Sequence, residues 1–501
     1  MIKNLKTNRK DWIMLAIIMI CFFLFWFISS MVLQHNFHTI YEIGYVEQAL
    51  WNTNEGNFFY SISNSGNHFA NHNSPILFLM LPFYYLFTSI FTIFFFCNVA
   101  IILGTIPIFK IAKEKLNSRT AGFIFAISYL MYPTFFYSNL RSFHPIMLSV
   151  PFIAFALYFM HKKDWTKTTI FLVIAMMTNE TISLLVIMFG IFIFLKKKSP
   201  KKVGMILVII GILWFLISTK AIIPSFSQGE NYRFIGGLYG HLGSSASEIV
   251  STIIVDPGYA FSYGSPDTKV EYLKILFKHN IFLSILSPEI LFLTIPVFLQ
   301  NLLSSSGYKY SYVAHYTYPI IPILLFAAII GTRRISNWIT LLFRINYRNV
   351  LRIILILLLI SSIFSWIASG ITPTIKENCY LFDNVYQEGK CPVSYDIIGN
   401  SPKENYPFIK DIISQIPDDS SVMAQNHLFS QLTQREETYR TNIYSQCSYA
   451  EYFILDMKGN IEGIDNFEEY LSDIVPNIGY ELLEQHKNVY LFKRIGEERC
   501  Y

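Results

Sequence analysis

Long apolar runs fill residues 12–370 and set the architecture that we expect for the chain. The first run, residues 12–33, holds no charged side chain and exceeds the apolar core of a secretory signal. About 20 consecutive apolar residues suffice for a helix to cross a bilayer. The pattern predicts an α-helical polytopic membrane protein with about eleven spans, the first of which is retained.

Basic residues mark the ends of the runs that we expect to face the cytoplasm. Four of them precede the first run: Lys3, Lys6, Arg9 and Lys10. Because loops rich in Lys and Arg stay on the cytoplasmic side, the N-terminus is expected in the cytoplasm. After the first span the chain is outside, and a second basic cluster, which begins at Lys110, is expected in the cytoplasm. Only one of the two apolar stretches between them, residues 75–91 and 93–109, can therefore cross the membrane. We expect residues 75–91 to form a re-entrant or interfacial helix on the outer side.

Polar residues interrupt two of the apolar runs and indicate broken hairpins. Residues 168–195 have lysines at both ends and contain Thr178-Asn179-Glu180 in the middle, and a later run breaks at Ser287-Pro288-Glu289. The charge pattern puts Glu180 at the outer tip of the first hairpin. Counting the spans onward places the tail of the chain outside the cytoplasm.

The composition changes near Gly370 and marks a domain boundary. Charged residues make up 15% of the whole chain, against roughly 25% in soluble proteins, but reach ordinary density after this point. We expect a transmembrane domain over residues 1–370 and a small extracytoplasmic α/β domain over residues 371–501. In the tail we expect helices at residues 407–416 and 467–475, and strands at residues 421–424, 452–455 and 489–492. The tail has neither a Gly-rich phosphate loop nor a nucleophile elbow, so we assign it no chemistry of its own.

The cysteines fit an extracytoplasmic tail. Four of the six lie there: Cys379, Cys391, Cys447 and Cys500. Outside the cytoplasm cysteines form disulfides, so we expect two bridges with three alternative pairings. Four free thiols in a cytoplasmic tail are the alternative.

Ionisable side chains in or beside a membrane are costly to keep, so they are the candidates for function. By the topology above, a set of them lies on the outer side: Glu42, Glu47, His68, His72, Arg141, His144, Glu180, Arg233, His241 and His315. The net charge of +5 gathers in short clusters at span ends and forms no stripe, which argues against nucleic acid as a partner. The lipid bilayer is the expected surrounding.

The first outer loop holds two acidic residues, Glu42 and Glu47. They stand five residues apart in an amphipathic, aromatic segment that suits a helix lying at the membrane interface. Five residues turn a helix by about 140°, so the two carboxylates do not share one face. We expect one to point to a cavity and the other to a structural partner.

The outer residues together suit proton transfer beside a bound phosphate, because they combine carboxylates, imidazoles and an arginine. Each also has an ordinary explanation: Arg141 reaches headgroups, Glu180 caps a helix, and His72 is a lone interfacial imidazole. His and Glu also bind divalent metals. A metal cofactor therefore stays open, although no H-E-x-x-H spacing occurs.

These landmarks resemble those of an uncharacterised prokaryotic family of polytopic membrane proteins, a domain of unknown function that is similar to the GT-C glycosyltransferases. They occur in order over about residues 10–370: Glu42-Ile-Gly-Tyr-Val-Glu47-Gln-Ala-Leu-Trp-Asn52, His72-Asn-Ser-Pro-Ile-Leu, Tyr132-Pro133, Phe143-His144-Pro145, Asn179-Glu180, Pro288-Glu289 and His315-Tyr316. The resemblance implies a GT-C-like membrane domain that uses a polyprenyl-phosphate-linked sugar on the extracytoplasmic face. It also implies an acidic base in the first outer loop, at positions that are more often Asp in the family and are Glu42 and Glu47 here.

Three functions stay open on the sequence. In a glycosyltransferase, a carboxylate of the first outer loop deprotonates an acceptor hydroxyl while basic residues hold the leaving phosphate. A lipid or solute transporter or flippase would explain the two broken hairpins, although the two halves show no repeat. A non-catalytic membrane scaffold would use its tail to bind a partner.

The candidate catalytic residues are Glu42 and Glu47, and the candidate substrate-binding residues are His72, Arg141, His144, Glu180, Arg233 and His315. The sequence identifies neither the sugar nor the acceptor.

Overall fold

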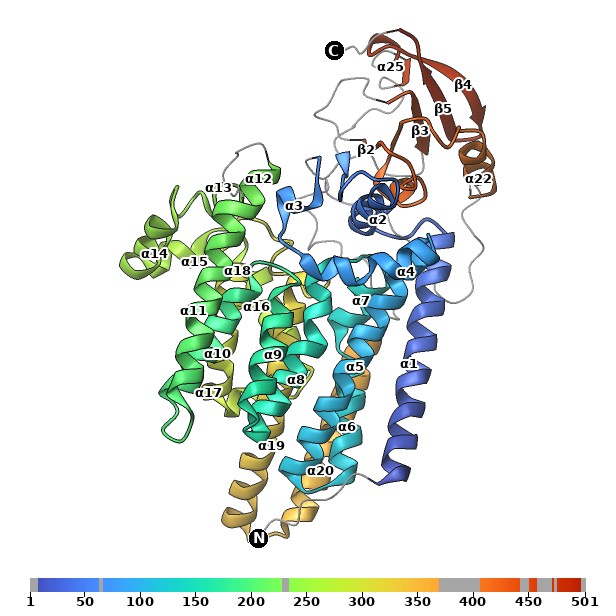
Figure 1. Ribbon diagram of the computed structural model, residues 1–501. Coiled ribbons are helices and arrows are strands. Elements are labelled where there is room, and N and C mark those ends of the chain that lie inside the picture. The colour runs from blue at the N-terminus through green and yellow to red at the C-terminus, as the bar shows by residue number, and fades with distance from the viewer. Residues whose placement is uncertain are drawn as a thin grey trace.

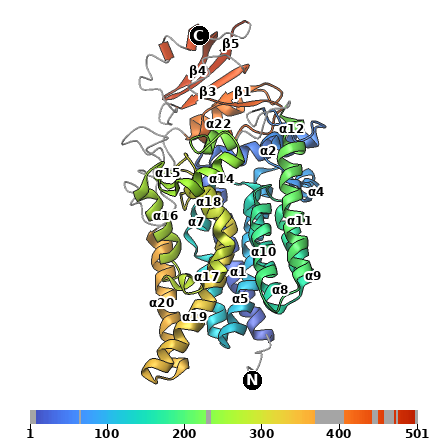
Figure 2. The ribbon, with the colours of Figure 1, turned by 90° about the vertical axis from the view of Figure 1, so that its left-hand side faces the viewer.

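The computed structural model describes residues 8–62, 66–227, 234–368, 406–441, 450–456, 471–472 and 475–496. Most of residues 9–366 are helical, and the longer helices run side by side as an elongated bundle (Figure 1). A small β-sheet domain sits at one end of the bundle, and helix α1 (Arg9–His35) begins at the other end (Figures 1 and 2). The helical polytopic architecture and the small C-terminal α/β domain are confirmed.

Six stretches of the described chain are long and apolar enough to cross a membrane. They are α1, α5 (Ile90–Leu116), α8 (Ser149–Lys162) with the turn η3 (Pro145–Leu148), α11 (Lys201–Ile217) with η4 (Ser218–Ile222) and α12 (Ile223–Phe226), α19 (Ile321–Phe343) with η7 (His315–Ile320), and α20 (Tyr347–Trp366). Shorter apolar helices are α9 (Trp165–Met176), α10 (Ile182–Leu195), α17 (Pro288–Leu291) and α18 (Ile295–Leu302).

The count of about eleven spans is therefore not confirmed. Several expected spans are built from shorter helices instead. The expected span at residues 123–137, for example, is split between α6 (Arg119–Leu130) and α7 (Pro133–Arg141). Pro133 opens α7 because proline fits the first turn of a helix but cannot continue one.

Short helices gather at the end of the bundle that carries the sheet domain, among them α2, α3, α4 and α13 to α15 (Figures 1 and 2). The bounds of the remaining helical segments of the membrane part are α2 (Tyr41–Asn54), α3 (His68–Asn71), η2 (Pro75–Leu79), α4 (Leu81–Leu86), α13 (Phe234–Tyr239), α14 (Ala246–Val255), α15 (Pro257–Ser262), α16 (Pro266–Lys278), η5 (Leu283–Leu286) and η6 (Phe292–Thr294). We call the end of the bundle that carries the β-sheet domain the sheet-domain end.

Residues 75–91 do not form a continuous helix. They divide into η2, five residues long, and α4, six residues long, before Ser89 caps the start of α5. Neither segment approaches the roughly 20 residues that a span needs. In Figure 1 α4 lies across the sheet-domain end of the bundle, as expected for an interfacial segment.

The first broken hairpin forms as predicted from the sequence. Helices α9 and α10 run beside each other, and Asn179 and Glu180 lie in the turn between them.

Helix α10 also packs closely on α11, where Gly190 and Gly204 face each other. A Cβ atom at Gly204 would lie 2.7 Å from the carbonyl oxygen of Gly190. Small residues allow this backbone approach, which is a common way to pack membrane helices.

Buried and half-buried ion pairs occur at the end of the bundle where α1 begins. Lys113 of α5 pairs with Asp11 of α1 at 3.0 Å, and Lys162 of α8 pairs with Glu114 at 2.8 Å. The basic cluster that begins at Lys110 therefore lies at the opposite end from the sheet domain.

The C-terminal domain is a mixed sheet with strand order β2-β1-β3-β5-β4. Strand β1 (Val422–Ala424) is parallel to β2 (Thr438–Arg440) and to β3 (Tyr452–Asp456). Strand β5 (Val489–Arg494) is antiparallel to β3 and to β4 (Tyr480–His486). Three short helices complete the described part of the domain: α22 (Tyr406–Ser414), α23 (Asn426–Phe429) and α25 (Val475–Asn477).

Several expected elements of the tail are confirmed. Helix α22 covers most of the expected helix 407–416, and β1, β3 and β5 match the three expected strands. The boundary expected at residues 370 and 371 lies outside the described residues, as do most of the expected helix 467–475 and the cysteines Cys379, Cys391, Cys447 and Cys500.

Candidate functional site

Helix α2 carries Glu42 to a cluster of polar groups from distant parts of the membrane domain. The hydroxyl of Ser142, just after α7, donates to Glu42 Oε2 at 2.5 Å. The hydroxyl of Tyr308 donates to Oε1 at 3.3 Å, and His315 Nδ1 lies 3.5 Å from Oε2. The side chain of Glu42 is 14% exposed, so the carboxylate is held by protein groups and still reaches solvent.

These neighbours favour the charged form of Glu42. Burial raises the pKa of the carboxyl group, but His315 and the hydrogen bonds from Ser142 and Tyr308 outweigh it and bring the pKa below its usual value. Glu42 is therefore a carboxylate at neutral pH and can accept a proton.

Three imidazoles continue from Glu42 in a row. The ring of His315, at the start of η7, stacks on His144 with centroids 4.1 Å apart and an angle of 7° between the planes. His144 in turn meets the edge of His72, with centroids 4.8 Å apart. The three rings come from segments more than 70 residues apart in the sequence, so the fold alone brings them together.

Glu180 ends the row on the far side. His72 Nδ1 lies 2.9 Å from Glu180 Oε1, and the backbone N–H of Asn73 donates to Oε2 at 3.1 Å. The Glu180 side chain is fully buried, whereas His72 is 19% exposed. The tip of the α9–α10 hairpin thus supplies a second carboxylate, and the order is Glu42, His315, His144, His72, Glu180. We call these five residues the carboxylate–histidine row.

His144, in the middle of the row, is neutral, and His144 and His315 have ring nitrogens that are available for further hydrogen bonds. Burial, together with His315 and His72, holds the pKa of His144 well below its ordinary value. Among the described residues, His144 Nδ1 and both ring nitrogens of His315 have no hydrogen-bond partner within bonding geometry. A neutral imidazole offers one donor and one acceptor, so these rings can bind a polar substrate group.

Lys309 adds a positive charge beside the row. Its ammonium group lies 3.6 Å from the centre of the Tyr316 ring, and the Tyr316 and His315 rings are 4.0 Å apart. Burial lowers the pKa of Lys309 to about 7, although the charge of Glu180 opposes the shift. The sequence analysis missed Lys309 and Tyr308. The available signal was a Gly-Tyr-Lys-Tyr run that ends five residues before His315, on the expected outer side.

Glu47 lies outside this cluster. Its side chain is 1% exposed and accepts hydrogen bonds from Thr433 Oγ1 at 2.6 Å, Gln434 Nε2 at 2.9 Å and Tyr84 OH at 3.3 Å. Burial raises the pKa of Glu47 despite these hydrogen bonds. The two acidic residues of α2 therefore face different surroundings, as the helical spacing of about 140° requires.

Arg141 is buried at the end of α7. Its carbonyl oxygen accepts a hydrogen bond from the backbone N–H of Ile40 at 2.7 Å, which joins the end of α7 to the start of α2. This contact brings Ser142 next to Glu42. Arg233 lies outside the described residues.

The described residues contain no group of three or more His, Cys, Asp or Glu side chains arranged to hold a metal ion. In the carboxylate–histidine row, the stacked rings of His144 and His315 face each other through their planes. Metal ligands instead direct ring nitrogens at one point. The geometry gives no support for a metal at this place.

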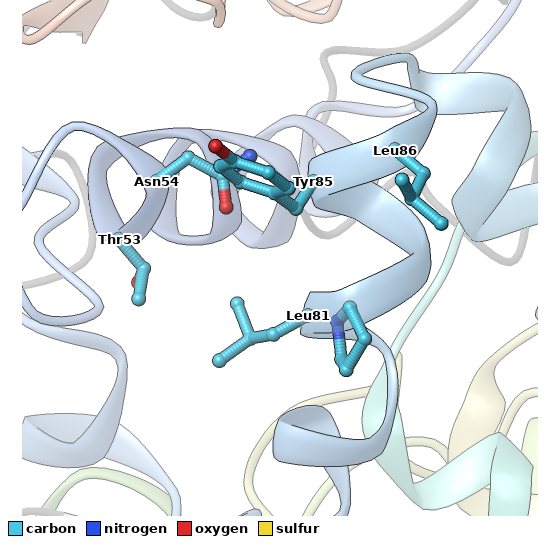
Figure 3. Close-up of a pocket in the computed structure, with 6 residues that line it drawn as sticks. Thr53, Asn54, Leu81, Tyr85 and Leu86 are labelled. Carbon is cyan, nitrogen blue, oxygen red and sulfur yellow. The ribbon is translucent and has the colours of Figure 1, made fainter.

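A cavity of about 550 Å³ lies at the other end of α2 (Figure 3). Thr53 and Asn54 of α2 face Leu81, Tyr85 and Leu86 of α4 across it. Thr53 follows Glu42 by eleven residues, or roughly 16 Å along the helix axis. This cavity is therefore separate from the carboxylate–histidine row.

The fold defines a multi-pass helical membrane protein with a polar cluster at its sheet-domain end. The chain belongs to the family described as predicted membrane protein (DUF2079), which it matches over residues 33–491. Its structure is similar to the crystal structure of ArnT from Cupriavidus metallidurans in the apo state, with a TM-score of 0.55 and 10% identity over 98% of this chain and 99% of that chain. This likeness shows the fold alone. The sequence matches none of the curated proteins.

Proposed function

We propose that this protein is a membrane glycosyltransferase that moves a sugar from a polyprenyl-phosphate donor to an acceptor on the extracytoplasmic face. The observation that carries the proposal is Glu42: a charged, partly exposed carboxylate on α2, held beside the imidazole of His315, with His144 and Lys309 near that ring. A base next to anion-binding groups is what glycosyl transfer from a phosphate donor needs.

In the proposed reaction Glu42 takes the proton of the acceptor hydroxyl. The acceptor oxygen then forms a bond to the anomeric carbon of the donor sugar, and the bond from that carbon to the phosphate oxygen breaks. The polyprenyl phosphate leaves with the electron pair. Lys309 and the N–H groups of His144 and His315 are the donors that balance the charge on the leaving phosphate.

The proposal includes an orientation. The basic residues beside α1 and α5 favour a cytoplasmic N-terminus, and α1 begins at the end of the bundle opposite the sheet domain. The carboxylate–histidine row and the C-terminal domain then face the outside. The tail cysteines are proposed to form disulfides there.

A transporter has less support. Transporters hold their substrates near the bilayer midplane, often at broken helices. Glu289, at the second broken run, forms a two-pronged ion pair with Arg334, at 2.6 and 3.0 Å, and is thereby neutralised.

The test uses Glu42→Gln in the purified full-length chain, reconstituted with polyprenyl-phosphate sugar donors. We expect turnover to fall by about 100-fold or more, the usual weight of a positioned base, with protein level and membrane insertion unchanged. His486→Gln, in the C-terminal sheet, is a control that should keep full turnover. No transfer by the wild type from any lipid-linked donor would overturn the proposal, and full turnover in Glu42→Gln would remove Glu42 from it.

A further inference from the structure

The C-terminal domain touches α2 on the face turned away from Glu42. Most of the described contacts come from helix α23 and the chain that follows it, residues 426–436, which we call the α23 segment; Arg440 of β2 adds a contact to the ring of Tyr41. On α2 they fall on Gly44, Glu47, Gln48 and Asn52. These positions lie one, three or four residues apart along α2 and together cover one side of the helix.

Hydrogen bonds from the α23 segment hold the middle and the end of α2. Thr433 and Gln434 donate to the buried carboxylate of Glu47 at 2.6 and 2.9 Å. The side chains of Gln48 and Asn52 both donate to the carbonyl oxygen of Glu436, at 3.2 and 3.1 Å. The carboxyl group of Glu47 is buried, and leaving it without these partners would cost free energy, so Glu47 is the main polar attachment.

The ring of Phe429 packs directly on the backbone of α2. A Cβ atom at Gly44 would lie 2.6 Å from Phe429 Cδ1, so any larger residue there would collide with the ring. The ring also meets the edge of Tyr45, with centroids 5.2 Å apart. Glycine at position 44 is thus explained by its contact with the C-terminal domain.

The same segment holds the chain that leads into α2. Gln34 donates to the carbonyl oxygen of Ser430 at 3.1 Å, and the hydroxyls of Thr39 and Ser430 lie 2.7 Å apart. The α23 segment therefore contacts α2 and its approach over residues 34–52.

On the opposite side, α2 presents Glu42 to Ser142 and His315. A helix of 14 residues is marginal by itself and takes its place from what packs on it. We propose that the α23 segment positions α2, and through it Glu42, with Glu47, Phe429 and Thr433 as the positioning residues. This inference rests on the proposed role of Glu42 as the base. If α2 is not held in position, Glu42 moves, and displacing a reacting group by about 1 Å can lower the rate about 100-fold.

The experiment compares Phe429→Ala and Thr433→Val with the wild type in the full-length chain, by hydrogen exchange and by transfer kinetics. Each variant removes contacts to α2 without changing the identity of Glu42. We expect the amides of α2 to exchange about tenfold faster or more, since Thr433→Val leaves the buried carboxyl group of Glu47 without one of its hydrogen bonds and Phe429→Ala removes the ring that packs on α2. Turnover number should fall by about 100-fold while the KM for the donor changes little, because the donor-binding groups lie elsewhere.

Phe408→Ala is the matched control, because Phe408 stacks on His486 within the C-terminal domain, with centroids 5.9 Å apart. It should leave α2 exchange and turnover unchanged. Gly44→Ala should speed α2 exchange through its collision with Phe429. In the double variant Gly44→Ala/Phe429→Ala the collision with the ring is gone and only the 3.0 Å approach to Thr433 Cγ2 remains, so its exchange should lie close to that of Phe429→Ala alone.

The two measurements separate the two proposals. Unchanged α2 exchange in both Phe429→Ala and Thr433→Val would overturn the positioning inference, whatever the activity. Faster exchange with full turnover would also overturn it. A wild type that transfers no sugar would overturn the proposed function. The positioning of α2 would then be decided by exchange at α2 and at Tyr308 and His315, which contact Glu42.

Discussion

Glu42 and Glu47 are the same kind of residue on the same short helix, and their neighbours make them different. Glu42 meets His315 and two hydroxyl groups and keeps partial access to solvent. Glu47 is buried against the C-terminal domain, where burial raises its pKa. A carboxylate that must bind and release a proton needs the first environment, whereas the second suits a fixed structural contact.

Lys309 gives a prediction for the pH dependence. Its pKa of about 7 means that the ammonium charge is present below pH 7 and is lost as the pH rises through that value. If this charge binds the donor phosphate, kcat/KM for the donor should decline above about pH 7. Glu42 has a lowered pKa, so its proton-accepting form persists through this range and is lost only in more acidic solution.

Lys309→Arg tests this assignment, since a guanidinium stays charged at all accessible pH values. We expect the alkaline decline to move up or vanish in this variant. Lys274→Arg, on an exposed face of α16, is the control and should keep the wild-type profile. An unchanged decline in Lys309→Arg would assign it to another group.

Part of the site could be predicted residue by residue. Glu42, His72, His144, Glu180 and His315 stand out because charged groups are rare in an apolar chain and gather on one predicted face. Their order in the row could not be predicted, because it depends on how segments distant in sequence pack. Lys309 gave little signal, since a lysine in an outer loop usually lies in solvent.

At the scale of helices and strands, the sequence failed to predict two features: a helix break at a proline and the edge strands of the C-terminal sheet. Apolar runs showed where helices lie, but the break before Pro133 turned one expected span into two helices. In the C-terminal sheet, the three predicted strands are the central β1, β3 and β5, and the two missed ones, β2 and β4, are its edges. Edge strands need no continuous apolar pattern; in β4, Leu482 and Leu483 are both exposed.

The short segments η2 and α4 give a prediction at this scale. Because neither can span the membrane, a reporter fused after Thr88 should lie on the same side as α2 and report an extracytoplasmic position. A fusion after Asn117, beyond α5, should report the cytoplasm. Cytoplasmic signals from both fusions would contradict the assignment of η2 and α4 to the outer surface.

At the scale of the whole molecule, the long axis of the bundle separates the basic end from the sheet domain (Figure 1). This arrangement predicts that the tail cysteines face an oxidising compartment. In intact cells, a membrane-impermeant thiol reagent should label Cys379, Cys391, Cys447 and Cys500 only after reduction.

Labelling of these cysteines without reductant would rule out disulfides. Labelling that requires permeabilised cells would instead place the tail in the cytoplasm. Cys97 is buried in α5 and serves as an internal reference that should stay unlabelled until the protein is denatured.

The residues of the carboxylate–histidine row lie far apart in the sequence, so they leave the ribosome at different times during synthesis. Glu42 leaves the ribosome early, His315 emerges more than 270 residues later, and the α23 segment emerges after that. A nascent chain therefore carries its acidic helix through most of membrane insertion without the groups that surround it in the finished protein. Any chain truncated before residue 426 would leave the face of α2 that carries Gly44, Glu47, Gln48 and Asn52 without its covering segment.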